Sequence, residues 1–132
     1  LVWMLTNPRA VRITRQSDNL WARILDVPAA LVGRDYAEQD CIRIQITADD
    51  MCPANKATWE LDTRQGRPTC VPTTAEADVV ASIGALSSLY FGGVSAHDLA
   101  AAGHVSPASQ STLHRLRRLF AIDPEPHNSF GF

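Results

Sequence analysis

Histidines and cysteines are the side chains in this chain best suited to metal binding or nucleophilic chemistry, and they are scattered along it. They are His97, His104, His114, His127, Cys41, Cys52 and Cys70. No two of them stand at a ligand spacing such as i, i+4 on one helix, and no cysteine pair has the C-x-x-C spacing of a zinc ribbon. The pattern predicts no protein metal site. An odd number of cysteines argues against a disulfide framework and favours a reducing cytoplasm.

Acidic pairs and glycine-rich loops are the next places to look for chemistry. Asp49 and Asp50 form an acidic pair, but they lie in a turn-rich segment, and we interpret them as solvated turn residues. The chain has no G-x-S-x-G elbow, no P-loop and no G-x-G-x-x-G fingerprint. Gly92-Gly93 follows an apolar stretch and is interpreted as the end of a helix.

The C-terminal end of the chain is unusual because it is apolar. Phe130-Gly131-Phe132 follows the proline-rich segment 123–126, whereas most chain ends are polar and frayed. If this tail is buried, it carries the terminal α-carboxylate of Phe132 into a site, where it could act as a base or bind a basic ligand. The alternative is that Phe130 and Phe132 only pin the tail to this domain's own core.

A helix before the tail is expected to position it. Ser106 is predicted as the N-cap and Pro107 as the first helical residue. The apolar residues that then share one helical face are Leu113, Leu116, Leu119 and Phe120. Segment 123–126 ends the helix, because proline lacks the amide donor and disfavours helical geometry in the residue before it.

Length and composition indicate one globular domain. The chain has 132 residues, 45% hydrophobic and 20% charged, with a formal net charge of −2. That charge gives no electrostatic drive towards nucleic acid or anionic membranes. No apolar run approaches the ~20 residues needed to span a bilayer. Because the sequence begins at Leu1 without an initiator methionine, we interpret it as part of a longer chain.

The periodicity of apolar residues predicts an α+β fold. Strands are predicted at 20–26, 41–47, 57–61, 69–71 and 77–82, and helices at 28–32, 83–91 and 95–102. The clearest strand has Ile42, Ile44 and Ile46 on one face. Short loops between the middle strands favour an antiparallel meander. We therefore expect an antiparallel sheet of about five strands with helices packed on one face.

Several segments together resemble a known family. They are residues 20–31 with Tyr36, the Cys-Pro-Ala-Asn run at 52–55, the block 78–93, and residues 119–132 with the phenylalanine ending. Their order and spacing resemble the C-terminal domain of the Eis (enhanced intracellular survival) family of actinobacterial N-acetyltransferases, a domain with a sterol-carrier-protein-like fold. The resemblance covers nearly the whole chain.

The resemblance implies a domain organisation. Residues 1–19 would be the lead-in from a missing N-terminal acetyltransferase region, and residues 20–132 the sterol-carrier-like domain. Two acetyltransferase-type domains would precede it in the same polypeptide and would bind acetyl-CoA. The resemblance further implies amine acceptors such as aminoglycosides or lysine-like groups, and a homo-oligomer for the full-length protein. The isolated chain is expected to be inactive.

The resemblance also implies a catalytic group. The carboxylate of Phe132 would reach back into the first acetyltransferase domain as the general base, with Phe130 and Gly131 close to the substrate. Two other functions remain open. One is a lipid-binding module, with an apolar tunnel lined by Ile42, Ile44, Leu86 and Leu89 in place of an ordinary core; the other is a structural domain for oligomer assembly.

Overall fold

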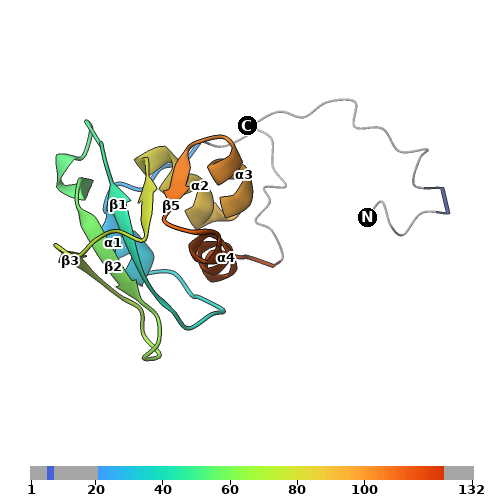
Figure 1. The fold of residues 1–132 in the computed structure, drawn as a ribbon, viewed down its shortest axis with the longest axis horizontal. Coiled ribbons are helices and arrows are strands. Elements are labelled where there is room, and N and C mark those ends of the chain that lie inside the picture. The colour runs from blue at the N-terminus through green and yellow to red at the C-terminus, as the bar shows by residue number, and fades with distance from the viewer. Residues whose placement is uncertain (1–5, 8–20, 124–132) are drawn as a thin grey trace.

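A computed structural model describes residues 6–7 and 21–123 of the chain, and Figure 1 shows their arrangement. A five-stranded sheet is combined with short helices. The strands are β1 (Cys41–Ile46), β2 (Thr58–Asp62), β3 (Thr69–Thr73), β4 (Val79–Ala81) and β5 (Val105–Pro107). The helices are α1 (Val27–Val32), the 3₁₀ turn η3 (Pro53–Asn55), α2 (Ile83–Phe91), α3 (Ala96–Ala101) and α4 (Gln110–Leu119). The predicted α+β class is confirmed.

The strands lie in the order β3-β2-β1-β4-β5. The first three form the predicted antiparallel meander, and β5 pairs antiparallel with β4. The pairing of β4 with β1 is parallel, because the chain crosses from the edge strand β3 to the far side of β1 before it forms β4. The sheet is therefore mostly antiparallel, with one parallel pairing that the periodicity alone did not predict.

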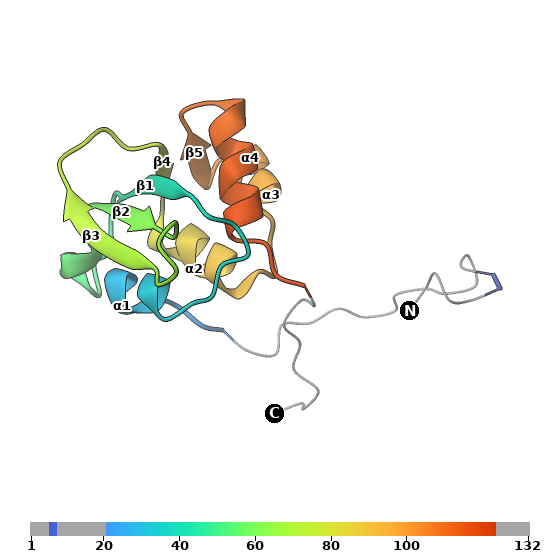
Figure 2. The same ribbon diagram turned by 90° about the horizontal axis from the view of Figure 1, so that it is seen from below.

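One face of the sheet carries the core. Ile42, Ile44 and Ile46 of β1 are buried, and their partners across the sheet, including Leu61 and Val79, are buried with them. The intervening side chains of β1 lie on the opposite face and stay partly or fully exposed. Figure 2 shows α1 and α2 on the same side of the sheet. The prediction that helices cover one face is confirmed.

The predicted strand at 20–26 is wrong for its described part, because residues 21–26 form no strand. Their backbone groups bond to side chains instead of to a neighbouring strand. The amide of Ile24 donates to Ser87 Oγ at 3.0 Å, and the carbonyl of Leu25 accepts from Asn55 Nδ2 at 3.1 Å. Among residues 21–26 only Ile24 is buried in the core.

The predicted helix start at Ser106 and Pro107 is also wrong. These residues belong to β5, the edge strand, where Pro107 stands opposite Val79. An edge position tolerates proline because the missing amide need not pair with a further strand. The N-cap of α4 is Ser109, whose Oγ accepts from the amide of Thr112 at 3.1 Å.

The predicted limits of α2 are confirmed, and those of α1 and α3 are confirmed to within one residue. Helix α4 instead ends at Leu119, before the predicted end at segment 123–126, with Phe120 as its C-cap. Helix α2 covers the predicted range 83–91, and Gly92 follows it with φ 74°, the left-handed conformation that glycine adopts without steric cost. Ser95 caps α3 by accepting from the amide of Asp98 at 3.1 Å and donating to its carboxylate at 2.7 Å. Among the described residues no helix is long and apolar enough to cross a membrane.

Candidate functional site

The residues predicted to do chemistry, Phe130, Gly131 and Phe132, lie outside the described part of the chain, as does the lead-in 1–19 except for residues 6 and 7. The description reaches Asp123, four residues after the end of α4. The structure shows how the domain holds the end of α4, after which the C-terminal segment begins.

Helix α4 is held against the sheet by its buried face and by one ion pair. Leu113, Leu116 and Leu119 are buried, as predicted. On the flank of the helix, Arg115 donates to both carboxylate oxygens of Asp40, at 2.9 and 2.7 Å, and to the carbonyl of Cys41. The hydrogen bond from Arg115 is the main reason that the pKa of Asp40 lies below its ordinary value. This contact fixes α4 relative to the start of β1.

The C-terminal ends of α2 and α4 meet at one buried arginine, Arg34, which is only 8% exposed. Its Nη1 donates to the carbonyls of Leu89 (3.2 Å) and Tyr90, and its Nη2 donates to the carbonyl of Phe120 at 2.8 Å. The guanidinium carbon also lies 5.0 to 5.8 Å from the ring centroids of Tyr36, Tyr90 and Phe120. We call this arrangement the Arg34 clamp.

The charge of Arg34 is balanced without a carboxylate partner among the described residues, where its hydrogen bonds all go to carbonyl oxygens. The C-terminal end of a helix carries roughly half a negative charge, so the two helix ends together offset about one positive charge. The aromatic faces add cation–π attraction. Burial lowers the pKa of Arg34 from its ordinary value, but arginine keeps its proton in proteins. The positive charge of Arg34 thus attracts the C-terminal ends of both α2 and α4 and holds them together.

The residues just after α4 pack against the turn that follows α2. A Cβ atom placed on Gly92 would come within 2.9 Å of Ile122 Cδ1 and within 3.1 Å of Ile122 Cβ. A small pocket of about 150 Å³ between these segments is lined by Leu89, Arg117 and Phe120 among others. Glycine is therefore required at position 92 both for its backbone conformation and for the close approach of Ile122.

We expect Gly92→Ala to destabilise the domain by roughly 1–2 kcal/mol from the left-handed backbone alone, and by more once Ile122 is displaced. Urea unfolding measures the loss. Gly66→Ala is the matched control, because Gly66 also has a positive φ, 82°, but has no atom near its missing side chain. An equal loss in both variants would show that the contact with Ile122 contributes nothing.

A second polar network corrects the interpretation of the acidic pair. Asp50 is exposed as expected, but Asp49 is buried. Asp49 accepts from Asn55 Nδ2 at 2.9 Å, from Arg23 and from the amide of Cys52. The hydrogen bond from Asn55, followed by those from Arg23 and Cys52, lowers the pKa of Asp49 to about 2. This ionised carboxylate ties segment 21–26 to the loop before β2.

The histidines and cysteines are not gathered into a site. His97, His104 and His114 are exposed on α3, the following loop and α4, and His127 lies outside the described residues. Within residues 6–7 and 21–123 no group of three potential ligands could hold a metal ion. The described cysteines are free thiols. Burial raises the pKa of Cys70 to about 12 and also raises the pKa of Cys41, so neither is a ready nucleophile.

The residues proposed to line a lipid tunnel lie in the protein core. Ile42, Ile44, Leu86 and Leu89 are at most 2% exposed and belong to one cluster of buried apolar side chains. Their contacts are those of ordinary core residues.

Comparison with known proteins places these features in a family. Residues 27–129 match the model of the sterol carrier protein domain. The N-acetyltransferase Eis of Mycobacterium tuberculosis is 34% identical over 129 residues, which is 98% of this chain and 31% of the relative. An uncharacterised N-acetyltransferase of Streptomyces avermitilis is 33% identical over 118 residues, 89% of this chain and 29% of the relative. The chain thus spans about a third of the length of these relatives.

Solved structures of N-acetyltransferases agree with these sequence comparisons. The crystal structure of Eis1 from Mycobacterium abscessus superposes with a TM-score of 0.83 at 30% identity, over 97% of this chain and 32% of that one. A GCN5-related N-acetyltransferase of Anabaena variabilis superposes with a TM-score of 0.71 over 79% of this chain and 26% of that one, and at 23% identity it supports the fold alone. The chain belongs to the sterol carrier protein domain family, and it is a domain of the type found in Eis N-acetyltransferases.

Proposed function

We propose that this domain works within a longer N-acetyltransferase that transfers an acetyl group from acetyl-CoA to an amine such as an aminoglycoside or a lysine-like group. The observation that carries the proposal is the 34% identity with Eis over 98% of the chain. The domains that precede it in the polypeptide are its partners. We further propose that the full-length protein is cytoplasmic and homo-oligomeric.

The role proposed for this domain is to supply a general base, the C-terminal carboxylate of Phe132. An ammonium group must lose a proton before its nitrogen can attack an acyl carbon. A terminal carboxylate has a reference pKa of about 3.3–3.7 and is ionised at neutral pH, so it both attracts the ammonium and accepts its proton. Burial beside Phe130 would raise that pKa and make the carboxylate a stronger base. Phe130 and Gly131 would lie next to the bound amine.

The described end of α4 suits this role because it is a fixed origin. The Arg34 clamp holds the carbonyl of Phe120, and Ile122 packs on Gly92. From Ala121 to Phe132 the chain has twelve residues, which span at most roughly 40 Å when extended. That reach is sufficient for a neighbouring domain. A rigid origin reduces the freedom that the carboxylate must lose on entering a site, as positioning requires.

We propose that acetyl-CoA binds outside the described residues. Its phosphates favour backbone amides at a helix N-terminus. Gly92-Gly93 instead follows the C-terminal end of α2, where the helix dipole is negative and the carbonyls point outward. We therefore assign acetyl-CoA binding to the acetyltransferase domains of the longer polypeptide.

The 132-residue chain by itself is expected to show no acetyl transfer above background when mixed with acetyl-CoA and a polyamine aminoglycoside. The reason is that we assign acetyl-CoA binding to the acetyltransferase domains of the longer polypeptide. Release of free coenzyme A thiol measures turnover. Turnover well above the blank without protein would show that the active site lies within these residues and would overturn the assignment.

A further inference from the structure

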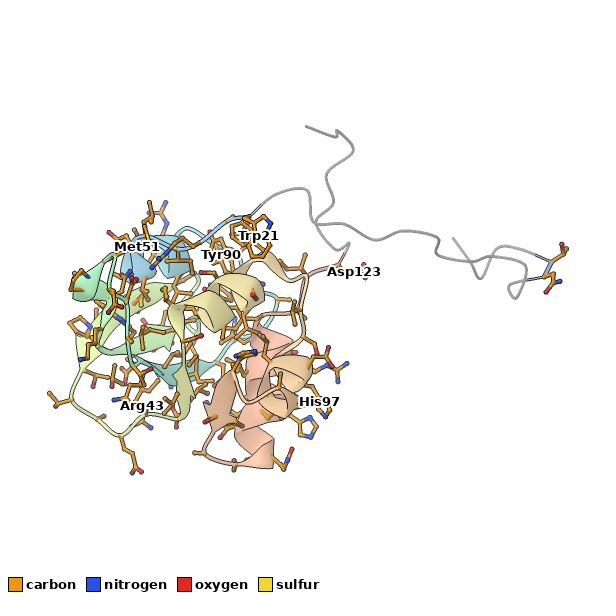
Figure 3. All side chains as sticks on the ribbon, turned by 90° about the horizontal axis from the view of Figure 1, so that it is seen from above. Trp21, Arg43, Met51, Tyr90, His97 and Asp123 are labelled. Atoms are coloured by element: carbon orange, nitrogen blue, oxygen red, sulfur yellow. The ribbon has the colours of Figure 1, made fainter. Side chains whose placement is uncertain are left out.

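A row of large apolar side chains is exposed beside the start of the described domain. Trp21 is 85% exposed, Leu25 63% and Met51 72%. We call Trp21, Leu25 and Met51 the apolar row. Apolar side chains that are singly exposed need no explanation, but a group of them at one place marks an interaction surface. Figure 3 shows Trp21 and Met51 at the same margin of the domain.

The row is connected and held rigidly. Arg23 Nη1 lies 2.8 Å from Met51 Sδ, and Arg23 Nη2 pairs with the buried Asp49. Asn55, which bonds Asp49, also holds the carbonyl of Leu25. Segment 21–26, which is held by these contacts and forms no strand, thus exposes Trp21 and Leu25 while Ile24 is buried.

A groove adjoins the row. Its volume is about 520 Å³, and its lining includes Trp21, Arg23, Ser88 of α2, Leu99 of α3 and His104. Tryptophan, methionine and arginine, the types of Trp21, Met51 and Arg23, are enriched at protein interfaces. The small serine and alanine residues that make up half of the groove lining are not. The side chain of Arg23, one of the lining residues, is 31% exposed.

We infer that the apolar row and its groove form the docking face for the acetyltransferase region of the same longer polypeptide, the relatives of this chain being about three times its length. This inference rests on the proposed function only in assuming that longer polypeptide. The large extent of chain outside this domain supplies an occupant. The row includes Trp21, the first residue of the described segment 21–123.

Methionine oxidation tests the inference without measuring activity. Peroxide converts an accessible thioether to a sulfoxide, and Met51 supplies the probe within the row. A Val71→Met variant supplies a reference methionine. Val71 is 51% exposed and lies in β3 on the face of the sheet that points away from the core. The oxidation rate of Met51 is divided by that of the V71M side chain, in the full-length polypeptide and in the 132-residue chain at several concentrations.

We expect this ratio to be at least tenfold lower in the full-length protein and independent of concentration in the 132-residue chain. Leu25→Glu in the full-length protein should raise this ratio to within about twofold of its value in the 132-residue chain. Val71→Glu, tested in a form without V71M, should leave the oxidation rate of Met51 unchanged.

Equal ratios in the full-length protein and in the 132-residue chain would overturn the inference. A ratio that is already low in the 132-residue chain would also overturn it, because residues 1–20 would then cover the row. A ratio that falls as the concentration rises would show that a second copy of the chain covers it. Acetyl transfer can fail in either case, so the two proposals fail separately.

Discussion

Removing Phe132 from the full-length polypeptide is expected to lower acetyl transfer by roughly 10²–10⁴-fold, the usual loss when a positioned general base is lost. The deletion leaves a carboxylate on Gly131, but it withdraws that group by about 3.3–3.6 Å along the chain. Displacements of about 1 Å can already cost 10²-fold in positioned reactions. The measurement is kcat/KM with acetyl-CoA and an aminoglycoside.

Unfolding could imitate this loss, so the deletion needs a stability control and a matched variant. Burying one phenylalanine stabilises by only about 1.5–3 kcal/mol, against a typical ~5–15 kcal/mol for a domain. Phe132→Ala keeps a terminal carboxylate at the same chain position and removes only the ring, so it should retain most of the activity that the deletion loses. If the deletion stayed active while Phe132→Ala lost activity, the ring would be the functional group and the carboxylate proposal wrong.

Replacing Arg34 with methionine is expected to destabilise the domain by about 2–6 kcal/mol. Methionine fills a similar volume but removes the donor to the carbonyls of Tyr90 and Phe120, whereas the carbonyl of Leu89 still accepts from the amide of Gly92. Each unsatisfied buried acceptor costs about 1–3 kcal/mol. Urea unfolding of the 132-residue chain measures the change. In the full-length protein the same variant should also lower kcat, because the Phe120 end of α4 is the origin of the catalytic tail.

Two variants separate the parts of this effect. Arg34→Lys keeps the positive charge but not the planar fork that reaches carbonyls on two helices, so it should fall between wild type and Arg34→Met. Arg118→Met removes an exposed arginine from the last turn of α4 and should change stability by no more than about 0.5 kcal/mol. A loss in Arg34→Met no larger than in Arg118→Met would show that the clamp contributes no stability.

Much of the fold could be predicted because its causes are local. The alternation of Ile42, Ile44 and Ile46 specifies a half-buried strand, and the 3.6-residue period of Leu113, Leu116 and Leu119 specifies the buried face of α4. Helix ends depend on residues a few positions apart, so the end of α2 followed from Gly92 and the start of α3 from Ser95. The capping role of Ser82, which was assigned to the preceding strand, was not predicted. These patterns need no knowledge of what lies across the core.

Residues 20–26 and 105–107 were misassigned because strand formation requires a partner. The apolar run from 20 to 26 has the composition of a strand, yet its described backbone finds Ser87 and Asn55 before any strand. Ser106-Pro107 has the composition of a helix start, yet an open edge beside β4 accepts it. The parallel pairing of β4 with β1 likewise depends on which edge remains free after the meander forms.

The general-base role of the Phe132 carboxylate was inferred from the resemblance to the Eis family, because no motif within the chain identifies it. The sequence by itself determined the positions of most helices and strands, the buried face of the sheet and the family. Only the tertiary structure decided the Arg34 clamp and the exposure of the apolar row. Arg34 finds its acceptors 55 to 86 residues away, and the partners of a polar side chain at such separations are set by how the elements pack, which no local periodicity encodes.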